Sequence, residues 1–454
     1  MPVEGRSIGK IALAGETEEM TQNIPTYLTT ELARIAYLSE RDRDMVFKQL
    51  MHHINKDALQ KCFDKLDRKA ASGSDGITKD QYGQNLNENL HTLVTRMKRM
   101  SYRPSSVREV LIPKEGKVGA TRPLGISNLE DKIVQRMFQQ VLSAIYEPLF
   151  LDCSYGFRPG RSCHDAIKAL RAHLYWSPVQ VVIDVDLANF FGTIDHQVLL
   201  DILGQKIHDQ RFLRYVQRMF RAGVLSEGEL RMSDEGVPQG SICSPVLANI
   251  VAHHVIDQWF ENTVKHHCHS EVKLFRYADD LCICCNNAHD AKRIKKALEK
   301  RLERFNLKLN REKTHSVIFN RQLPCQSSGA FEFLGFTFYM GKSLRGRPLP
   351  KLKSSGKRIR SKLKRVSEWA KKIRNRLPLK EIWHRFCAKL RGHVQYYGVS
   401  FNTKRVECFL WRATKIMFKW LNRRSQKKSF TWDSFMAFLQ AYPRPAARVV
   451  HSLI

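Results

Sequence analysis

No stretch of this chain approaches the about 18 uninterrupted apolar residues that a membrane-spanning helix needs. The N-terminus also lacks the apolar core of a secretory signal. The 11 cysteines are scattered through the 454 residues without a regular spacing, which fits a reducing compartment. We therefore expect a cytoplasmic protein that is not inserted in a membrane, and the length allows two or three domains.

Acidic residues are scarce in the last quarter of the chain. Residues 341–454 contain 30 Lys and Arg but only four acids, a net charge of +26, whereas residues 1–340 carry only +6. The total of +32 is typical of proteins that bind nucleic acid. The basic segment also contains five tryptophans, so it has enough large apolar residues to fold. A folded cationic surface with aromatic side chains suits structured RNA or a template duplex.

Two adjacent carboxylates, Asp279 and Asp280, stand between the β-prone apolar runs 272–276 and 281–285. This pattern predicts a β-hairpin with the acids at its tip. Two like charges about 4 Å apart repel by roughly 4 kcal/mol at an effective dielectric near 20. A divalent cation such as Mg²⁺ offsets that repulsion. The alternative is a solvated turn, which suits an acid pair with no other acids nearby.

Other acids stand in a second apolar run, at 181–187, which carries Asp184 and Asp186 and predicts a buried strand. Side chains at i and i+2 point to the same face of a strand, so both carboxylates share one face. A buried strand rarely tolerates an unpaired acid. Asp186, at the end of the strand, would complete a two-metal site with Asp279 and Asp280. Asp184 is either part of this site or a salt-bridged structural acid.

Two further patterns imitate metal sites. Cys282 and Cys285 have the spacing Cys-x-x-Cys, but strand alternation sends them to opposite faces, and we interpret them as core residues. The run 266–269 reads His-His-Cys-His. Neighbouring loop residues seldom share one tetrahedral ion, and no partner pair stands at zinc-site spacing, so we do not expect zinc there.

Motifs of one known family follow one another along the chain. They stand at 71–78, 101–104, 112–114, 122–126, 154–162, 181–191, 236–241, 244–245, 277–280, 309–314, 333–336, 390–392 and 396–397. In this ordered set, which covers roughly residues 25 to 450, the chain resembles the group II intron reverse transcriptase/maturase family.

This resemblance implies an α+β fold, namely the right-hand polymerase fold with fingers and a split-βαβ palm, followed by an α-helical thumb/maturase domain. The implied organisation is a flexible N-terminus (1–24), an N-terminal helical extension (25–70), fingers (71–180), a palm (181–340), a basic helical thumb (341–425) and a short C-terminal nucleic-acid-binding segment (426–454). Within the thumb segment, residues 341–360 are expected to be a basic linker or extended stretch.

The resemblance also assigns roles to individual residues. Asp186, Asp279 and Asp280 are the implied ligands of two Mg²⁺ ions, for which Mn²⁺ is a possible substitute. Lys313 matches a position that protonates the leaving pyrophosphate; the alternative is an exposed lysine at a helix end.

The remaining implied site residues contact substrates. Lys114 and Arg122 match basic residues that clamp the triphosphate, and Gln239 and Gly240 match the motif that meets the incoming nucleotide. Phe191 matches a bulky ring under the sugar that excludes a 2′-hydroxyl; a core phenylalanine is the alternative. Leu334 and Gly335 match the turn that holds the primer end. Arg158 and Arg161 either orient template and loops or form structural ion pairs.

The implied function is RNA-directed DNA polymerisation, with binding of intron RNA to assist splicing and mobility. The expected partners are template or intron RNA, a DNA primer or target DNA, and dNTPs, in a bacterial-type cytoplasm with the protein associated with the nucleoid or a ribonucleoprotein. We expect a form of the family without an endonuclease domain, and therefore no cleavage of a target strand by this protein. Three alternatives stay open: a polymerase domesticated for phage defence, CRISPR spacer acquisition or DNA repair; a non-catalytic splicing factor; and an RNA-copying RNA polymerase.

Overall fold

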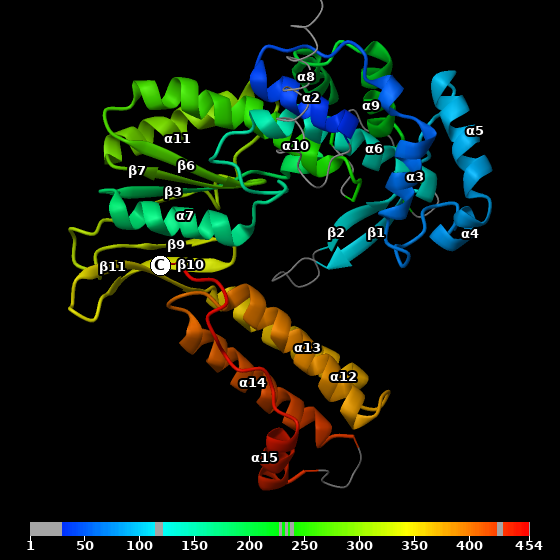
Figure 1. Ribbon diagram of the computed structural model, residues 1–454. Coiled ribbons are helices and arrows are strands. Elements are labelled where there is room, and N and C mark those ends of the chain that lie inside the picture. The colour runs from blue at the N-terminus through cyan, green and yellow to red at the C-terminus, as the bar shows by residue number, and fades with distance from the viewer. Residues whose placement is uncertain are drawn as a thin grey trace, which may run out of the picture.

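The computed structural model describes residues 30–113, 121–226, 229–231, 235–236, 240–424 and 430–453. Lys114, Gln239 and the expected N-terminal segment 1–24 therefore lie outside the described residues. Figure 1 shows a broad body of helices and sheets, from which the C-terminal helices α12 to α15 extend on one side.

A four-stranded antiparallel sheet, called here the central sheet, has the strand order β6-β7-β3-β8. Strands β6 and β7 form the hairpin expected from the sequence, and β3 is the expected acid-bearing strand. The bounds are β3 (Val181–Asp186), β6 (Val272–Tyr277), β7 (Asp280–Cys285) and β8 (His315–Ile318).

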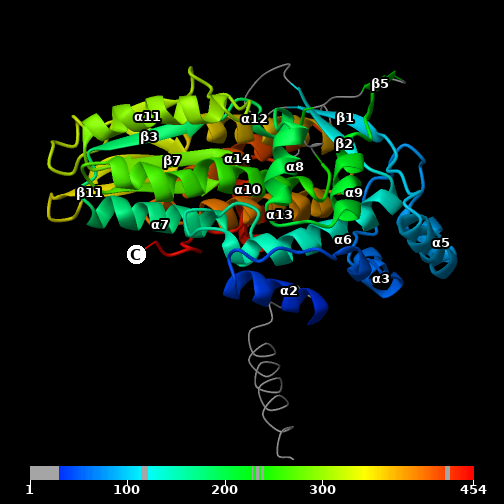
Figure 2. The ribbon, with the colours of Figure 1, turned by 90° about the horizontal axis from the view of Figure 1, so that it is seen from above.

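The alternation of side chains along the central sheet divides the interior into two cores. Val181, Ile183 and Val185 of β3 join a core with α10 and α11, whereas Val182 joins a second core with α7. Seen from above, β3 and β7 lie between α11 and α7 (Figure 2). By the same alternation, Asp184 and Asp186 lie on the α7 side of the sheet, together with Cys282. The helices are α7 (Cys163–Trp176), α10 (Ser244–Ala252) and α11 (Ala288–Glu303). Cys285 belongs to the opposite core, which confirms that the two cysteines face apart.

The N-terminal half packs against the α10 side of the central sheet. Its long helix α6 carries an almost continuous set of buried apolar residues, and α2 and α3 pack on it. A second sheet, with the order β2-β1-β4-β5, projects beside these helices. The bounds are α2 (Thr30–Arg41), α3 (Lys56–Asp64), α4 (Lys79–Gln84), α5 (Leu86–Lys98), β1 (Val107–Pro113), β2 (Thr121–Ile126), α6 (Leu129–Tyr146), α8 (His196–Gly204), α9 (Gln210–Phe220), β4 (Val224–Ser226) and β5 (Glu229–Arg231).

A third sheet, with the order β11-β10-β9, connects the body to the C-terminal helices. The stretch expected as a basic linker or an extended segment, 341–360, is extended in the end of β10 and in all of β11 and then begins α12, so the structure supports the extended alternative for most of it. Its alternate residues are buried against β10, which a charge count alone does not reveal. The bounds are β9 (Ala330–Phe333), β10 (Phe336–Lys342), β11 (Pro348–Ser354), α12 (Gly356–Ile373), α13 (Leu379–Tyr397), α14 (Thr403–Leu421) and α15 (Trp432–Ala441).

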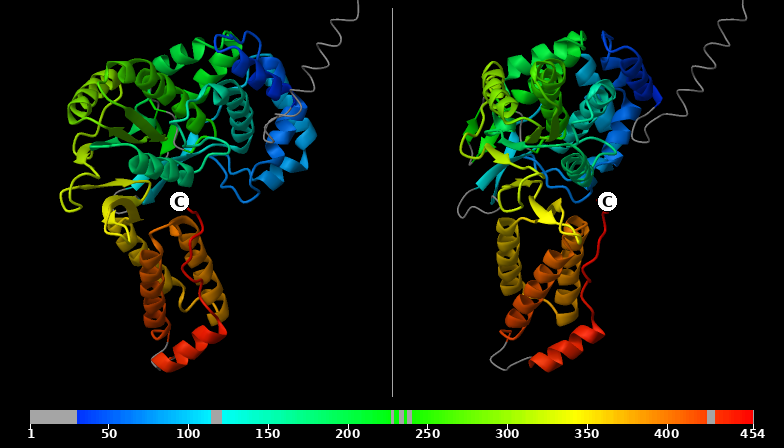
Figure 3. Two further views of the ribbon diagram at one scale, coloured as in Figure 1. Left: turned by 60° about the vertical axis from the view of Figure 1, so that its left-hand side comes forward. Right: turned by 90° about the vertical axis from the view of Figure 1, so that its left-hand side faces the viewer.

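The C-terminal helices share a core with the central sheet. Buried residues of α12, α13 and α14 belong to the same cluster as α7 and the third sheet. After α15 the chain runs back along these helices towards the body (Figure 3). There His451 pairs with Val399, and the guanidinium of Arg171 on α7 donates to the carbonyl oxygen of Leu453 at 2.9 Å. These contacts fix the helices against the central sheet.

Among the described helices, none combines the length and the apolar character that crossing a lipid bilayer requires.

Candidate active site

The central sheet brings the predicted acids together. Asp186 is the last residue of β3 and Asp280 is the first of β7, and the antiparallel register places them directly opposite each other. Residues paired in this way have side chains on the same face of a sheet. The two residues of the hairpin turn are Ala278 and Asp279, and Asp280 follows as the first residue of β7. Ala278 takes the left-handed conformation, with φ 57°. The left-handed residue tightens the turn, so both acids stay beside the end of β3.

Burial and the charges of neighbouring acids favour the neutral forms of the Asp279 and Asp280 carboxyls. Burial raises the pKa of Asp280 to about 6, and the neighbouring charge of Asp279 adds to the increase. Burial also raises the pKa of Asp279, with a contribution from Asp186. Carboxylates crowded in this way form a ligand set for hard cations, which take oxygen ligands. Asp186, Asp279 and Asp280 are therefore the residues that could hold divalent metal ions.

Asp184 lies on the same face, one pair further along β3. Burial raises its pKa to about 7, and the charge of Asp280 adds to the effect. Its carboxyl accepts a hydrogen bond from the backbone of Glu332 on β9. No salt bridge joins Asp184 to a cation among the described residues, so the structure does not support the salt-bridge interpretation.

Lys313 reaches the site from the segment that connects α11 to β8. Its ammonium lies 2.6 Å from Oδ2 of Asp186, and this contact offsets one negative charge of the cluster. The segment is held on the end of β3, since the backbone N–H of Asn310 donates to the carbonyl oxygen of Asp186 at 2.9 Å. Lys313 therefore contacts an acid of the cluster from a turn before β8, not from a helix end, and its side chain is exposed.

Beneath the hairpin turn lies a fully buried ion pair that the sequence reasoning missed. Arg276, 0% exposed, forms two hydrogen bonds to the carboxylate of Asp257, at 2.7 and 2.5 Å. The same guanidinium donates to Asn249 Oδ1 at 2.9 Å, to Ser154 Oγ at 2.7 Å and to the carbonyl oxygen of Ala278 at 3.3 Å. Arg276 therefore ties the acidic turn to α10, to the following π-helix (His253–Asp257) and to the loop after Ser154. The available signal was that Arg276 falls on the opposite face of the strand from the exposed Lys273, four residues before Asp280.

The loop after Ser154 packs directly on the acidic turn. A Cβ added at Gly156 would lie 2.4 Å from the backbone nitrogen of Ala278, so only glycine fits there. Arg158 forms a buried ion pair with Glu147 at 2.6 Å, and Arg161 pairs with Asp152 at 2.6 Å. For these two arginines, the structure supports the ion-pair alternative.

Three aromatic rings lie beside the acids. Phe191, in the short helix Phe190–Gly192, makes an edge contact with Phe157, with ring centres 6.3 Å apart. The ring centres of Phe157 and Tyr277 lie 6.4 Å apart. Phe157 was not predicted as a site residue. In the structure its side chain is 54% exposed and its backbone is left-handed, with φ 58°. Backbone strain of this kind in a large residue is common at functional sites.

The other predicted residues surround the cluster to different degrees. Arg122 on β2 is exposed and close enough to lower the pKa of Asp279 against the effect of burial. Gly240 has φ 111°, and a Cβ there would lie 2.4 Å from the carbonyl oxygen of Gly125 in β2. Leu334 and Gly335 form the turn between β9 and β10, both with positive φ. Lys114 and Gln239 cannot be placed, because they lie outside the described residues.

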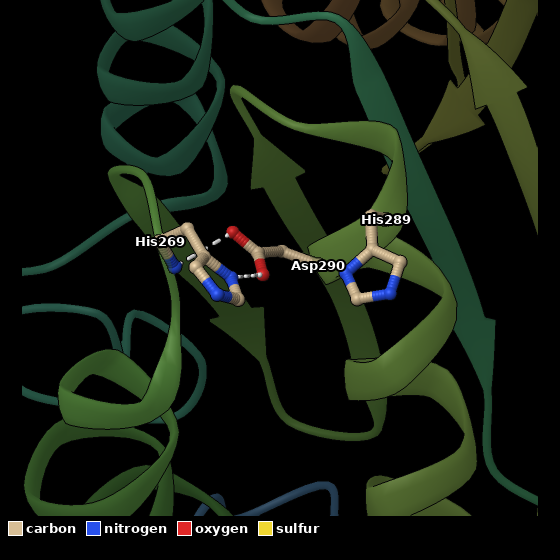
Figure 4. A group of neighbouring side chains, drawn as sticks. All are labelled: His269, His289 and Asp290. Carbon is tan, nitrogen blue, oxygen red and sulfur yellow. Dashed lines mark hydrogen bonds and ion pairs between the residues drawn. The ribbon is translucent and has the colours of Figure 1, made fainter.

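A separate group of possible metal ligands lies behind the hairpin. The side-chain ligand atoms of His269, His289 and Asp290 lie within 4.8 Å of one another (Figure 4). The buried carboxylate of Asp290, however, accepts from the backbone N–H groups of His269 and Ser270 at 3.0 and 3.2 Å, and Arg293 lies 3.6 Å from it. Because these donors and this cation already satisfy the carboxylate, we interpret the group as a structural brace of the loop before β6.

Comparison with known proteins agrees with this geometry. Residues 112–338 match the family described as "Reverse transcriptase (RNA-dependent DNA polymerase)". The range includes the acids of the central sheet and the Leu334–Gly335 turn.

Three curated relatives come from introns or intron-related sequences. "Group II intron-encoded protein LtrA" of Lactococcus lactis subsp. cremoris is 32% identical over 223 residues, 49% of this chain and 37% of that protein. An uncharacterised 91 kDa protein in the cob intron of Schizosaccharomyces pombe is 35% identical over 213 residues, covering 46% and 25%. The putative COX1/OXI3 intron 1 protein of Saccharomyces cerevisiae is 27% identical over 413 residues, covering 80% and 47%. The chain thus spans between a quarter and a half of the length of these relatives.

The buried ion pair generates a stability prediction. Arg276→Met leaves the Asp257 carboxylate buried and unpaired, and we expect a loss of roughly 3–5 kcal/mol in the free energy of unfolding, measured by urea denaturation. The double variant Arg276→Met/Asp257→Leu should recover part of that loss. Arg68→Met is the matched control, because the Arg68–Asp80 pair is exposed and is worth about 0–1 kcal/mol. Equal effects of the buried and exposed changes would contradict the role given to Arg276.

The acid cluster generates a prediction about pH. The pKa of Asp280 is raised to about 6 in the folded state. The contribution of this carboxyl to the free energy of unfolding is therefore present at low pH and is lost as the pH rises through 6. In EDTA, Asp280→Asn should therefore be more stable than the wild type at pH 8, by on the order of 2 kcal/mol, with the difference closing towards pH 4. Thermal unfolding across this pH range measures it, with the exposed Asp44→Asn as control. A difference that stays constant with pH would refute the assignment.

Proposed function

The chain belongs to the group II intron reverse transcriptase/maturase family, and on this basis we propose that it copies RNA into DNA by nucleotidyl transfer at the acids of β3 and β7. The observation that carries the proposal is the register pair Asp186–Asp280 with Asp279 beside it. Three acids, two of them with pKa values raised by burial, converge there from distant parts of the chain. A fold needs no such cluster for its own stability, so the cluster indicates chemistry.

In this proposal the folded elements take the places of a right-hand polymerase. The central sheet with α7, α10 and α11 is the palm, the β2-β1-β4-β5 sheet with its helices is the fingers, and α12 to α14 form the thumb. Segment 71–180 would supply most of the fingers and 181–340 most of the palm, while α8, α9, β4 and β5 extend from the palm segment towards the fingers.

Asp186, Asp279 and Asp280 would hold two divalent ions, Mg²⁺ or Mn²⁺ in its place. Bound there, such ions would activate the primer 3′-hydroxyl and stabilise the leaving pyrophosphate. The protein's own part is to hold Asp186 and Asp280 on one face of the central sheet with Asp279 beside them, and to fix the turn through Arg276. Lys313 lies 2.6 Å from Asp186. From there its ammonium would donate a proton to the leaving pyrophosphate.

The residues around the acids would bind substrates. Arg122, on an exposed strand facing Asp279, would clamp the triphosphate together with Lys114. Gly240 allows the backbone to approach the nucleotide closely, beside Gln239. Phe191, braced by Phe157, would exclude a 2′-hydroxyl and so select dNTPs.

The C-terminal helices support a second part of the proposal, namely binding of intron RNA to assist splicing. Cationic side chains lie over tryptophan rings there: Lys389 over Trp369 at 5.1 Å, Arg374 over Trp420 at 5.1 Å, and Lys415 over the partly exposed Trp411 at 5.0 Å. Surfaces that combine positive charge with aromatic faces bind phosphates and unstacked bases together. Sequencing the RNA that co-purifies with the protein tests this part, since an intron RNA is expected and unselective RNA would count against it.

The main experiment is extension of oligo(dT) on poly(rA) with Mg²⁺ or Mn²⁺. Asp279→Asn should lower the extension rate by at least about 10³-fold, because a metal ligand supplies several kcal/mol in the transition state. RNA affinity in filter binding should stay unchanged, and Asp44→Asn should behave as the wild type. A wild-type protein that binds RNA but extends no primer would leave a non-catalytic splicing factor. Loss of RNA binding with activity in Asp279→Asn would point to a structural role.

Sugar selection provides a separate prediction. Phe191→Ala should raise rNTP incorporation relative to dNTP incorporation by at least about tenfold, since removing the ring makes room for the 2′-hydroxyl. Competition between the two nucleotides in single-nucleotide extension measures the ratio. Phe190→Leu is the matched control, because the ring of Phe190 is buried in the core. An unchanged ratio in Phe191→Ala would remove the steric role, and efficient rNTP use by the wild type would favour an RNA polymerase.

A further inference from the structure

Arg358 lies in the first turn of α12, which follows directly on β11 of the third sheet. Its side chain is exposed, and no ion pair joins it to an acid of the described part of the chain. It lies outside the range 112–338 that matches the family. An exposed guanidinium without an acid partner is available to bind an anion.

The turn between β9 and β10 is shaped around Arg358. A Cβ added at Gly335 would lie 3.3 Å from both Cδ and Nη1 of Arg358 and 3.1 Å from the hydroxyl of Tyr397. The carbonyl oxygen of Gly335 accepts from the backbone N–H of Ser355 at 3.0 Å, and that of Leu334 accepts from the hydroxyl of Tyr396 at 2.8 Å. The turn and the start of α12 are therefore one unit, and the glycine leaves room for the arginine.

The start of α12 is also tied to the strands beside the acid cluster. The hydroxyl of Ser355, three residues before Arg358, donates to the carboxylate of Glu332 on β9 at 2.7 Å. One helical turn further along the same face, Lys362 lies 4.5 Å from the ring centre of Tyr397 and continues the positive charge. Positive charge thus extends along α12.

We infer that Arg358 binds a phosphate of the terminal phosphodiester linkages of the primer strand. This inference rests on the proposed polymerase function and deepens it. In the proposed polymerase the growing 3′ end lies beside Asp186, Asp279 and Asp280 and is held by the turn at Gly335, so the phosphates just behind it would come within reach of Arg358. A guanidinium in this position can donate two parallel hydrogen bonds to phosphate oxygens. Arg358 then holds the primer end against the turn, and its role is positioning.

The first test is substitution. Arg358→Ala should weaken binding of a primer–template by about tenfold or more and lower extension efficiency in step, the scale of one charge-assisted hydrogen bond. Arg358→Lys should recover only part of the lost affinity, because an ammonium cannot form the two parallel hydrogen bonds that a guanidinium forms with a phosphate. Arg360→Ala is the matched control, since Arg360 is equally exposed and lies about 200° around the helix. Circular dichroism and thermal unfolding should be unchanged in all three variants.

The second test locates the phosphate. Primers with an uncharged methylphosphonate at one of the terminal linkages, one position at a time, are titrated against the wild type and Arg358→Ala. We expect one position at which the modification weakens the wild type by about tenfold and leaves Arg358→Ala unaffected. If the modified primers weaken both proteins equally at every position, or if Arg358→Ala binds like Arg360→Ala, the inference is wrong.

The two proposals fail separately. A wild-type protein without extension activity would refute the proposed polymerase function. The binding titration measures the contribution of Arg358 to primer–template affinity and needs no catalysis.

Discussion

The buried pair of Arg276 and Asp257 is the interaction on which the candidate site depends. Adjacent carboxylates repel one another, and a tight turn that carries two of them would open unless something held it closed. Arg276 does this from below, with hydrogen bonds to the Ala278 carbonyl and to side chains of two other segments. Burial acts to raise the pKa of Asp257, but the charge of Arg276, together with hydrogen bonds from Arg276 and His253, lowers that pKa below its usual value. One charge pair, fully removed from water, therefore fixes the backbone that holds the acid cluster above it, where Lys313 compensates only part of the negative charge.

Strand alternation explains why the repelling carboxylates of β3 lie on only one face of the central sheet. Val181, Ile183 and Val185 fill the core with α10 and α11, while Asp184 and Asp186 face the other side, where the third sheet and the C-terminal helices begin. A shift of one residue in the register of β3 would move both acids into the first core. The apolar residues of β3 thus specify the position of the acids, and the folding energy of one core supports an arrangement that is unfavourable by itself.

Much of this could be read from the sequence, because it depends on local periodicity. Alternation placed Asp184 and Asp186 together, and the apolar runs around Asp279 and Asp280 predicted the hairpin. Local patterns were less decisive where charge concealed alternation: they predict a basic linker or an extended stretch at 341–360, yet Leu352, between two lysines, is buried in β11. They also could not pair distant residues. The contacts of Arg276 with Asp257, or of Arg358 with the Gly335 turn, follow from packing between segments and leave only weak traces, such as an arginine and a lysine on opposite faces of one strand.

Packing between segments also decides how the C-terminal helices relate to the acids. Strand β10 begins at the Gly335 turn and pairs with β11, which leads through Ser355 directly into α12. The hydroxyl of Ser355 donates to Glu332 on β9 at 2.7 Å, and the backbone of Glu332 in turn donates to Asp184. A continuous set of hydrogen bonds therefore runs from the central sheet to the first turn of α12. Because the same helices share a buried core with α7, a displacement of α12 that moved Arg358 away from Asp280 would have to break this set or open that core. The basic helices are thus positioned relative to the acids by the fold, and any nucleic acid that binds both must fit a spacing that is already set.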